Sequence, residues 1–227
     1  MDWPALTLSL RLGALTVLIL LPIGIFLGRA LAWSKIPGRG FVEAMLTLPL
    51  VLPPTVLGYY FLVAFGGASP LGQAFHAIFG QTLVFSFSGL LVASVIVNLP
   101  FAVQPMQRAF EAIPDELRHA GACCGLRPWQ VLLRIDLPLA WPGIVTGLVL
   151  TFAHTLGEFG VVLMVGGSIP GETKVISIAI YEQVESLELA TAHALAAGLL
   201  AFSFVVLVTV YVVNRRINLG PAAREAR

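Results

Sequence analysis

Residues 44–67 read AMLTLPLVLPPTVLGYYFLVAFGG, and no Asp, Glu, Lys or Arg occurs anywhere in residues 44–107. The whole chain is 58% hydrophobic and 11% charged, with a mean hydropathy of +0.91, whereas a soluble domain carries about 25% charged residues. A soluble fold of 227 residues exposes too much surface to hide so many apolar side chains. The composition therefore predicts an all-α, polytopic membrane protein, because helices satisfy their own backbone groups in lipid.

Five stretches of the chain are long enough to cross a bilayer, which takes about 20 apolar residues in a helix. They are residues 6–31, 44–65, 83–106, 140–165 and 190–213. Residues 66–81 are uncharged but rich in Gly, Ser and Pro, and they predict a loop with room for a short interfacial helix. We expect one transmembrane domain over residues 5–215 and a short cytoplasmic tail over residues 216–227.

The basic residues predict the orientation of the chain, because cytoplasmic loops carry an excess of Lys and Arg. Arg11 and Lys174 lie on one side, and the other eleven basic residues follow the first, third and fifth spans. Those eleven are Arg29, Lys35, Arg39, Arg108, Arg118, Arg127, Arg134, Arg215, Arg216, Arg224 and Arg227. The N-terminus is therefore expected outside and the C-terminus in the cytoplasm. Residues 30–32 are similar to a signal-peptide cleavage site, but without a basic n-region we expect the first span to be retained.

The longest cytoplasmic stretch, between the third and fourth spans, carries the signals of two short helices. Pro114 suits the first turn of a helix, and Gly125 is placed to end that helix. Between them, residues 119–124 read HAGACC, which is small on nearly every face. A second helix is expected to start at Pro128 and to stop at Pro138. Such an element could lie in a cleft of a partner protein or on the membrane surface, and composition leaves both interpretations open.

The same stretch resembles the cytoplasmic signature of permeases in ATP-binding-cassette importers. In that signature Glu-Ala-Ala is followed by three residues, Gly, nine residues and Ile-x-Leu-Pro. Here Gly125 is followed by nine residues and then by residues 135–138, IDLP. Ala120 matches the middle of the opening triplet, whereas His119 stands in place of Glu and Gly121 in place of Ala. The resemblance implies that residues 107–139 form the coupling segment that docks on a separate ATPase subunit. Its expected contributors are Glu116, His119, Ala120, Gly121, Gly125, Ile135, Leu137 and Pro138.

Three further stretches resemble molybdate permease subunits. They are residues 48–60 (LPLVLPPTVLGYY), 155–160 (TLGEFG) and 169–173 (IPGET). Sulfate and thiosulfate permeases share a similar Gly-Glu-Phe-Gly segment, so a sulfate or thiosulfate importer is the alternative. The resemblance implies a type I importer permease in the bacterial inner membrane, with molybdate as cargo and tungstate as its alternative. It also implies a homodimer of the chain, two cytoplasmic ATPase subunits and an extracytoplasmic oxyanion-binding protein.

Glu158 is the only acidic residue inside a predicted span, where an ionisable group costs at least about 2.5 kcal/mol. His154 lies one turn earlier on the same face. An unpaired carboxylate would repel an anionic cargo. We therefore favour a structural role, in which Glu158 bonds backbone N–H groups where Gly157 and Gly160 loosen the helix. Direct contact with cargo is the alternative.

Prolines interrupt the second span, and broken helices at membrane depth occur where they line a cavity or pack in protein. A gate or pathway segment and a static kink are both consistent with this pattern. The candidate pathway residues from the second and fourth spans are Pro53, Pro54, Thr55, Gly58, His154, Gly157, Glu158, Phe159 and Gly160.

The sequence also argues against other classes of protein. It has no G-x-x-x-x-G-K-[ST] phosphate loop, so we expect ATP hydrolysis on a separate subunit. It has no H-E-x-x-H helix or recognisable Ser-His motif, which disfavours an intramembrane enzyme, and no internal repeat, which disfavours a secondary transporter. Cys123 and Cys124 are adjacent and offer too few ligands for a metal site. We expect no catalytic residue, no cofactor, and no nucleic-acid partner, because no basic stripe occurs.

Overall fold

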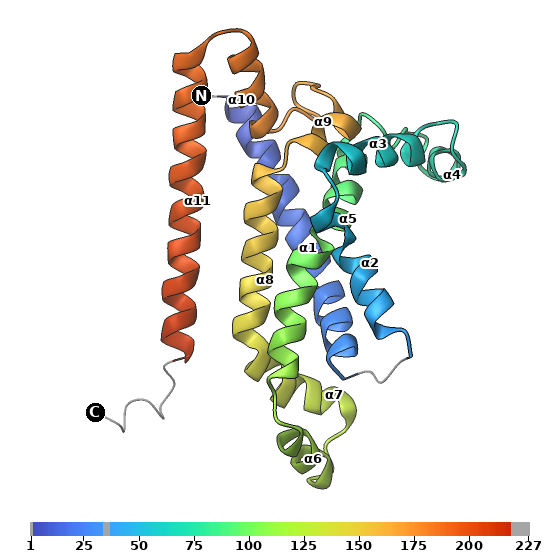
Figure 1. Ribbon diagram of the computed structural model, residues 1–227, viewed down its shortest axis with the longest axis vertical. Helices are drawn as coiled ribbons and strands as arrows, with labels where there is room; N and C mark the ends of the chain where they lie inside the picture. Colours follow the sequence, from blue (N-terminus) through green and yellow to red (C-terminus); the bar gives the residue numbers. More distant parts are fainter. Residues whose placement is uncertain (1, 34–36, 219–227) are drawn as a thin grey trace.

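The computed structural model describes residues 2–33 and 37–218, and every regular element in these ranges is a helix (Figure 1). The all-α prediction is therefore confirmed. In chain order the helices are α1 (Trp3–Trp33), α2 (Arg39–Val51), α3 (Pro54–Phe65), α4 (Pro70–Phe79), α5 (Phe87–Glu111), α6 (Asp115–Cys123), α7 (Pro128–Val131), a π-helix (Leu132–Asp136), α8 (Leu137–Gly157), α9 (Gly160–Gly166), α10 (Ile176–Glu185) and α11 (Leu189–Asn218).

Four helices in the described ranges are long and apolar enough to cross a membrane: α1, α5, the continuous run Pro128–Gly157, and α11. The pair α2 and α3 meets the same test only together, and its two helices are bent by 107°. The five predicted spans are thus found if the bent pair counts as one, but the second span is broken instead of straight. Lys35 and residues 219–227 of the predicted tail lie outside the described residues.

The predicted end of the fourth span and the predicted end of the second cytoplasmic helix at Pro138 are both wrong. The span does not continue to residue 165, because α8 ends at Gly157 and Glu158 has extended backbone, with φ −68° and ψ 128°. At its other end Pro138 does not stop a helix. The N–H of Leu137 donates to the Leu132 carbonyl across a π-turn, so Pro138, which has no N–H to donate, follows a widened turn within a continuous helix.

Helix α5 is the centre of the bundle and packs against both α1 and α8. Glycines bring these helices together at backbone distance. A Cβ atom on Gly28 of α1 would lie 3.0 Å from the backbone nitrogen of Gln107, and one on Gly147 of α8 would lie 2.8 Å from the Ala102 carbonyl oxygen. Small residues at such crossings are typical of membrane helix packing, where close contact replaces the hydrophobic effect.

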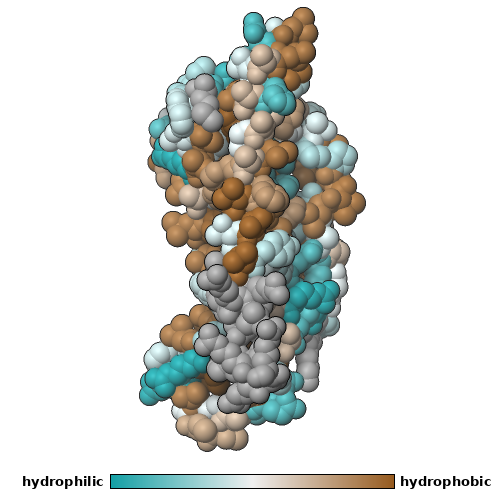
Figure 2. Space-filling view, turned by 90° about the vertical axis from the view of Figure 1, so that its left-hand side faces the viewer, coloured by the Kyte–Doolittle hydropathy of each residue, from teal (hydrophilic) through white to brown (hydrophobic). Residues whose placement is uncertain are grey.

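Helix α11 stands at one side of this core, next to α8 and α10 (Figure 1). Only 11% of its most apolar stretch is buried, and Phe204 and Tyr211 point away from the bundle. The surface seen from this side carries a broad hydrophobic area (Figure 2). This face therefore has the character expected of a surface in contact with lipid or with another membrane helix.

The short helices lie outside the core. α6 and α7 project beyond the bundle, at the end opposite α10 (Figure 1), and this end is referred to below as the α6 end. α4 extends sideways from α3 (Figure 1). The short helix predicted within residues 66–81 is thereby confirmed, and the side chain of Ser69 caps it by accepting from the Gly72 N–H at 2.9 Å.

Candidate functional site

The break between α2 and α3 follows directly from two adjacent prolines. Helix α2 ends at Val51, Pro53 has extended backbone, and Pro54 takes the first position of α3. Proline has no N–H and disfavours helical backbone at the preceding residue, so a helix cannot run through this pair. The chain turns here and sends α3 across α9.

Glycines allow α3 to cross α9 closely. A Cβ atom on Gly58 would lie 2.7 Å from the Cβ of Met164, and one on Gly160 would lie 2.8 Å from the Cβ of Pro54. Real Cβ atoms do not approach so closely, so both positions require glycine at this crossing. These two candidate pathway residues therefore hold two broken elements against each other.

The second break, between α8 and α9, is built around Glu158. Its side chain is 7% exposed, and its Oε1 accepts the N–H of Val161 at 2.9 Å. Its backbone carbonyl accepts the hydroxyl of Ser177 on α10 at 2.8 Å. The carboxylate thus satisfies a backbone donor at the start of α9 that has no partner within the helix, and a negative group is favourable at that end.

His154 lies beside this break on the last turn of α8. Its Nδ1 is 3.1 Å from Oδ1 of the fully buried Asn98. An amide oxygen can only accept, so the Nδ1–H is the donor. The ring stacks on Phe101 with centroids 4.1 Å apart, and its Nε2 lies 3.7 Å from Oε2 of Glu158. The predicted proximity of His154 and Glu158 is confirmed, and α5 contributes two partners that sequence reasoning did not identify.

Both breaks open on one cavity of about 150 Å³. It is lined by Pro49, Leu50, Leu52, Pro54, Leu57, Val97, Phe101, His154, Glu158 and Val161. Three predicted pathway residues, Pro54, His154 and Glu158, therefore meet in a mostly apolar space. Thr55 and Gly157, by contrast, are exposed.

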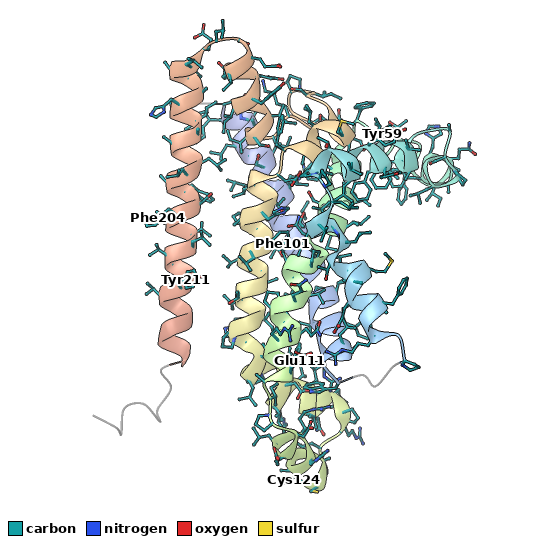
Figure 3. All side chains as sticks on the ribbon, viewed as in Figure 1. Tyr59, Phe101, Glu111, Cys124, Phe204 and Tyr211 are labelled. Atoms are coloured by element: carbon teal, nitrogen blue, oxygen red, sulfur yellow. The ribbon has the colours of Figure 1, made fainter. Side chains whose placement is uncertain are left out.

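A second cavity, of about 280 Å³, lies between α2 and α5 nearer the α6 end. It is lined by Arg39, Glu43, Leu46, Thr47, Val103, Gln104, Gln107 and Arg108. Residues of α2 and α5 line both cavities, and the two cavities along these helices are together called the α2–α5 groove below. Phe101 marks its middle and Glu111 its α6 end (Figure 3).

Charged side chains form a network at this end of the groove. Arg39 donates to Glu43 at 2.8 Å and to Glu111 at 2.5 Å. Gln107 donates to the same two carboxylates at 2.8 and 3.0 Å, and Arg108 pairs with Glu111 at 3.1 Å. Two cations thus balance two carboxylates. Sequence reasoning missed this network because Arg39 and Glu111 are 72 residues apart, although the Arg39–Glu43 spacing of four residues was a visible signal.

The predicted coupling segment forms a compact projecting unit of α6, α7 and the π-helix, with Cys124 at its tip (Figure 3). Glu116, His119 and Ala120 are exposed on α6. Gly125 ends the helix turn as predicted, with φ +75° in the left-handed region. The unit also exposes large apolar side chains, namely Leu117, Trp129 and Leu133. Exposed aromatic and aliphatic side chains on one projecting unit are consistent with a protein interaction surface.

The structure explains Gly121, which stands where the permease signature has alanine. Gly121 is the buried residue of α6, and a Cβ atom there would lie 2.6 Å from Cδ1 of Ile135. Ile135 belongs to the π-helix, so glycine lets α6 pack directly on it. Leu137 is half-buried and Pro138 exposed. Nothing in the structure explains His119.

No group of three or more His, Cys, Asp or Glu side chains comes together in residues 2–33 and 37–218. Cys123 and Cys124 are both exposed and carry free thiols. The predicted site residues thus fall into two regions. One lies at the helix breaks around the α2–α5 groove, and the other is the projecting α6 unit.

Comparison with known proteins gives a consistent family. Residues 21–219 match the family described as "Binding-protein-dependent transport system inner membrane component". The chain is 45% identical to the molybdenum transport system permease protein ModB of Azotobacter vinelandii, over 96% of both chains. It is 39% identical to ModB of Escherichia coli K12, over 82% of this chain and 81% of that one. A probable sulfate transport permease of Zygnema circumcarinatum is 29% identical over 95% of this chain and 76% of that one.

Solved structures support the same fold. A bacterial transporter involved in the import of alginate superposes with a TM-score of 0.75 at 19% identity, covering 94% of this chain and 79% of that one. The MetNI methionine transporter superposes with a TM-score of 0.67 at 19% identity, covering 95% and 94%. The chain therefore belongs to the family of inner membrane components of binding-protein-dependent transport systems, and it is a multi-pass permease of an ABC importer.

Proposed function

We propose that this permease forms the translocation pathway for molybdate, or for the related oxyanion tungstate. The observation that carries the proposal is similarity over nearly the full length to molybdenum permeases at 45% identity, against 29% for the sulfate permease relative. The α2–α5 groove supports a pathway on this chain, because its two cavities follow the broken span from the helix breaks towards the α6 end.

The groove has the chemistry of a conduit. The cavity at the helix breaks is mostly apolar, and its one carboxylate is engaged by the Val161 N–H. At the α6 end, Arg39 and Arg108 offset Glu43 and Glu111. A passing oxyanion would therefore meet neither an unpaired carboxylate nor a cationic trap, and a conduit must release what it admits. Selection of the anion would then rest with an extracytoplasmic binding protein.

Gln104 and Arg108 line the groove and are exposed in a single copy, which supports a pathway between two copies of this chain. In this arrangement the α6 end faces the cytoplasm, with the start of α1 on the outside. Arg108, Arg118, Arg127 and Arg134 all lie at the α6 end, as the bias of basic residues towards the cytoplasm requires. An ATPase subunit on each copy would dock on the projecting unit of α6 and α7.

Docking of the ATPase can be tested at an exposed alanine of α6. Ala120→Trp adds a large side chain to an exposed face without entering the bundle. We expect the variant to insert normally but to lose co-purification with the ATPase subunit. The matched control is Ala190→Trp, the same change at an exposed position at the opposite end of the molecule. Retained co-purification of Ala120→Trp at the wild-type level would contradict docking on this face.

The cargo can be tested by uptake of labelled molybdate in cells that lack the gene and are complemented with the wild-type chain. We expect uptake to return and to resist an excess of sulfate. Strong inhibition by sulfate would instead assign the chain to the sulfate branch. Tungstate should compete, because it has the same charge and tetrahedral shape as molybdate.

A further inference from the structure

Asp136 is the last residue of the π-helix, and its side chain has no exposed surface. An ionised carboxylate out of water is costly unless it is paired. Its Oδ2 accepts the Nε–H of Arg29 at 2.9 Å, and Arg29 lies near the end of α1. This ion pair joins residues 107 positions apart and fixes the base of the projecting unit to the first span.

The second cation near Asp136 comes from α6. The Nε of Arg118 is 3.7 Å from Oδ1 of Asp136, which is too long for a hydrogen bond. Both atoms are buried, and in the described part of the chain neither has a hydrogen-bond partner. Arg118 also lies 3.6 Å from the exposed Asp115. Arg118 is thus held close to a buried carboxylate without being fixed to it.

Trp33 completes this group at the last position of α1. The guanidinium of Arg118 lies 3.5 Å from the centroid of the Trp33 ring, and that of Arg29 lies 5.2 Å away. The edge of the ring meets Phe110 at the end of α5, with centroids 5.6 Å apart. Cations over an indole face are attracted by its electron density. The flat ring therefore offers Arg118 a surface along which it can shift while it remains stabilised.

These four residues, Arg29, Trp33, Arg118 and Asp136, are called the Asp136 cluster below. The cluster lies where α6 meets α1 and the π-helix that leads into α8. The π-helix adds to its significance, because this form is rare and is frequently found at functional sites. Arg29 is hydrogen-bonded to Asp136 at 2.9 Å, whereas Arg118 stays 3.7 Å away from it. A purely structural ion pair does not need this difference between its two cations.

We propose that the Asp136 cluster transmits movement of α6 to the membrane spans. The Arg29–Asp136 pair holds α1 and α8 together, while Arg118 slides over Trp33 and closes on Asp136 when an ATPase subunit moves α6. Arg118 and Asp136 are then positioning residues for coupled transport, and neither touches cargo or nucleotide. This inference rests on the proposed docking of the ATPase on α6.

The test compares hydrolysis and transport in the purified complex of the chain with its ATPase and binding-protein partners, reconstituted in proteoliposomes. Arg118→Gln removes the charge at similar length, and we expect the ATPase subunit to stay bound and to hydrolyse ATP near the wild-type rate. The molybdate imported per ATP hydrolysed should fall about fivefold or more, which is the scale of typical coupling between sites. Arg118→Lys keeps the charge but not the planar contact with Trp33. Its molybdate-to-ATP ratio should therefore lie between those of the wild type and Arg118→Gln.

Arg11→Gln is the matched control, since Arg11 is an exposed arginine of α1 that belongs neither to the projecting unit nor to the α2–α5 groove, and its molybdate-to-ATP ratio should not change. An unchanged ratio in Arg118→Gln would contradict the proposal, whether the two rates stay normal or fall together. Loss of the ATPase subunit from this variant would also contradict it, because Arg118 would then belong to the docking surface. If the wild-type complex itself shows no ATP-driven uptake, the proposed function fails instead.

A double-mutant cycle tests whether Arg118 acts through Asp136. We expect Arg118→Gln combined with Asp136→Asn to lower the molybdate-to-ATP ratio no further than the worse single variant, because residues in one network are not additive. Independent, additive losses would contradict a shared role. If Asp136→Asn lowers the yield of folded protein, the comparison of Arg118→Gln with Arg118→Lys still decides the outcome.

Discussion

At the scale of single residues, Glu158 shows how a carboxylate is kept at membrane depth. It is buried at a break in the helix, where its Oε1 accepts the Val161 N–H at 2.9 Å. The sequence predicted this type of bond from the two glycines that flank the residue. Nε2 of His154 lies 3.7 Å from Oε2, which is too long for a hydrogen bond, so it is the bond from the Val161 N–H that supports the structural interpretation over direct contact with cargo.

Glu158→Gln should therefore keep near-normal uptake and thermal stability, because the amide oxygen can still accept the Val161 N–H. Glu158→Ala should lose about 0.5–2 kcal/mol, the usual cost of removing a helix cap. The measurement is molybdate uptake together with the melting temperature of the purified protein. An inactive Glu158→Gln at normal membrane levels would mean that the negative charge itself is needed.

A second ionic group lies at the opposite end from α6. Lys174 pairs with Glu182 at 2.6 Å and with Asp2 at 3.7 Å, and Ser168 donates to Glu182. The hydrogen bond from Lys174, followed by that from Ser168, holds the pKa of Glu182 below its usual range. The hydrogen bond to Glu182 raises the pKa of Lys174. The pair therefore joins α10, the loop before it and the start of α1 across the neutral pH range.

Glu182→Gln should lower the stability of the protein at neutral pH by about 1 kcal/mol or less, as for other partly exposed pairs. Because the folded-state pKa of Glu182 is lowered, this contribution is lost as the pH falls through it, and the difference should close below about pH 4. At the alkaline end the raised pKa of Lys174 preserves the pair beyond the usual lysine range. The measurement is the melting temperature of wild type and variant from about pH 3 to about pH 8.

The control for this pair is Glu172→Gln, which changes an exposed glutamate of the neighbouring loop and should show no such pH dependence. A stability difference between wild type and Glu182→Gln that persists unchanged at the acid end would contradict the assignment to this carboxylate.

At the scale of elements, the sequence predicted correctly the helices whose position is set by their apolar length. The first, third and fifth spans follow from length and hydropathy, and Gly125 ends α6 as expected. Two errors came from backbone chemistry that hydropathy does not record. The residues after Glu158 stay apolar although the helix has ended at Gly157, and the π-turn carries the helix through Pro138.

The groove and the Asp136 cluster were beyond the reach of sequence for a different reason. Arg39 and Glu111 are far apart in the chain and meet because α2 packs on α5. Arg29 and Asp136 meet because α1 packs beside the run of the π-helix and α8. Single-sequence patterns describe neighbours within a helix, whereas these pairs depend on helix register across the bundle. The visible signals were the Arg39–Glu43 spacing of four residues and a charged residue, Asp136, at the edge of a span.

The crossing of α3 over α9 gives a prediction about element packing. Gly58→Ala places a Cβ 2.7 Å from that of Met164, and overpacking of this kind costs about 1–3 kcal/mol. We expect a lower melting temperature and slower molybdate uptake. Gly67→Ala is the matched control, because a Cβ there has nothing within 4 Å. Equal stability of the two variants would contradict close packing at this crossing.

At the scale of the whole molecule, different faces of the chain suit different partners. We propose that the α2–α5 groove faces the pathway and that the α6 unit faces the ATPase, whereas the outer side of α11 has the apolar character of a lipid-facing surface. Gln104 lines the groove and is exposed, whereas Phe204 lies on α11 and points outwards (Figure 3). A comparison of these two positions therefore distinguishes a surface that lines the pathway from a surface that faces lipid.

Charged thiol reagents should therefore inhibit uptake by Gln104→Cys and leave Phe204→Cys active. Both variants need Cys123 and Cys124 replaced by serine, because these thiols are exposed. The reagent reaches Gln104 through water in the groove but does not enter lipid beside Phe204. Full activity of a completely labelled Gln104→Cys would exclude the groove as the pathway.

The central claim is that this chain moves molybdate only when a separate subunit hydrolyses ATP. The most direct measurement is accumulation of labelled molybdate in proteoliposomes that contain the purified complex and its binding protein, with either the active ATPase or a hydrolysis-deficient variant. We expect accumulation that requires ATP and the active ATPase and that resists excess sulfate. Accumulation that follows an ion gradient without ATP, or that sulfate abolishes, would contradict the account.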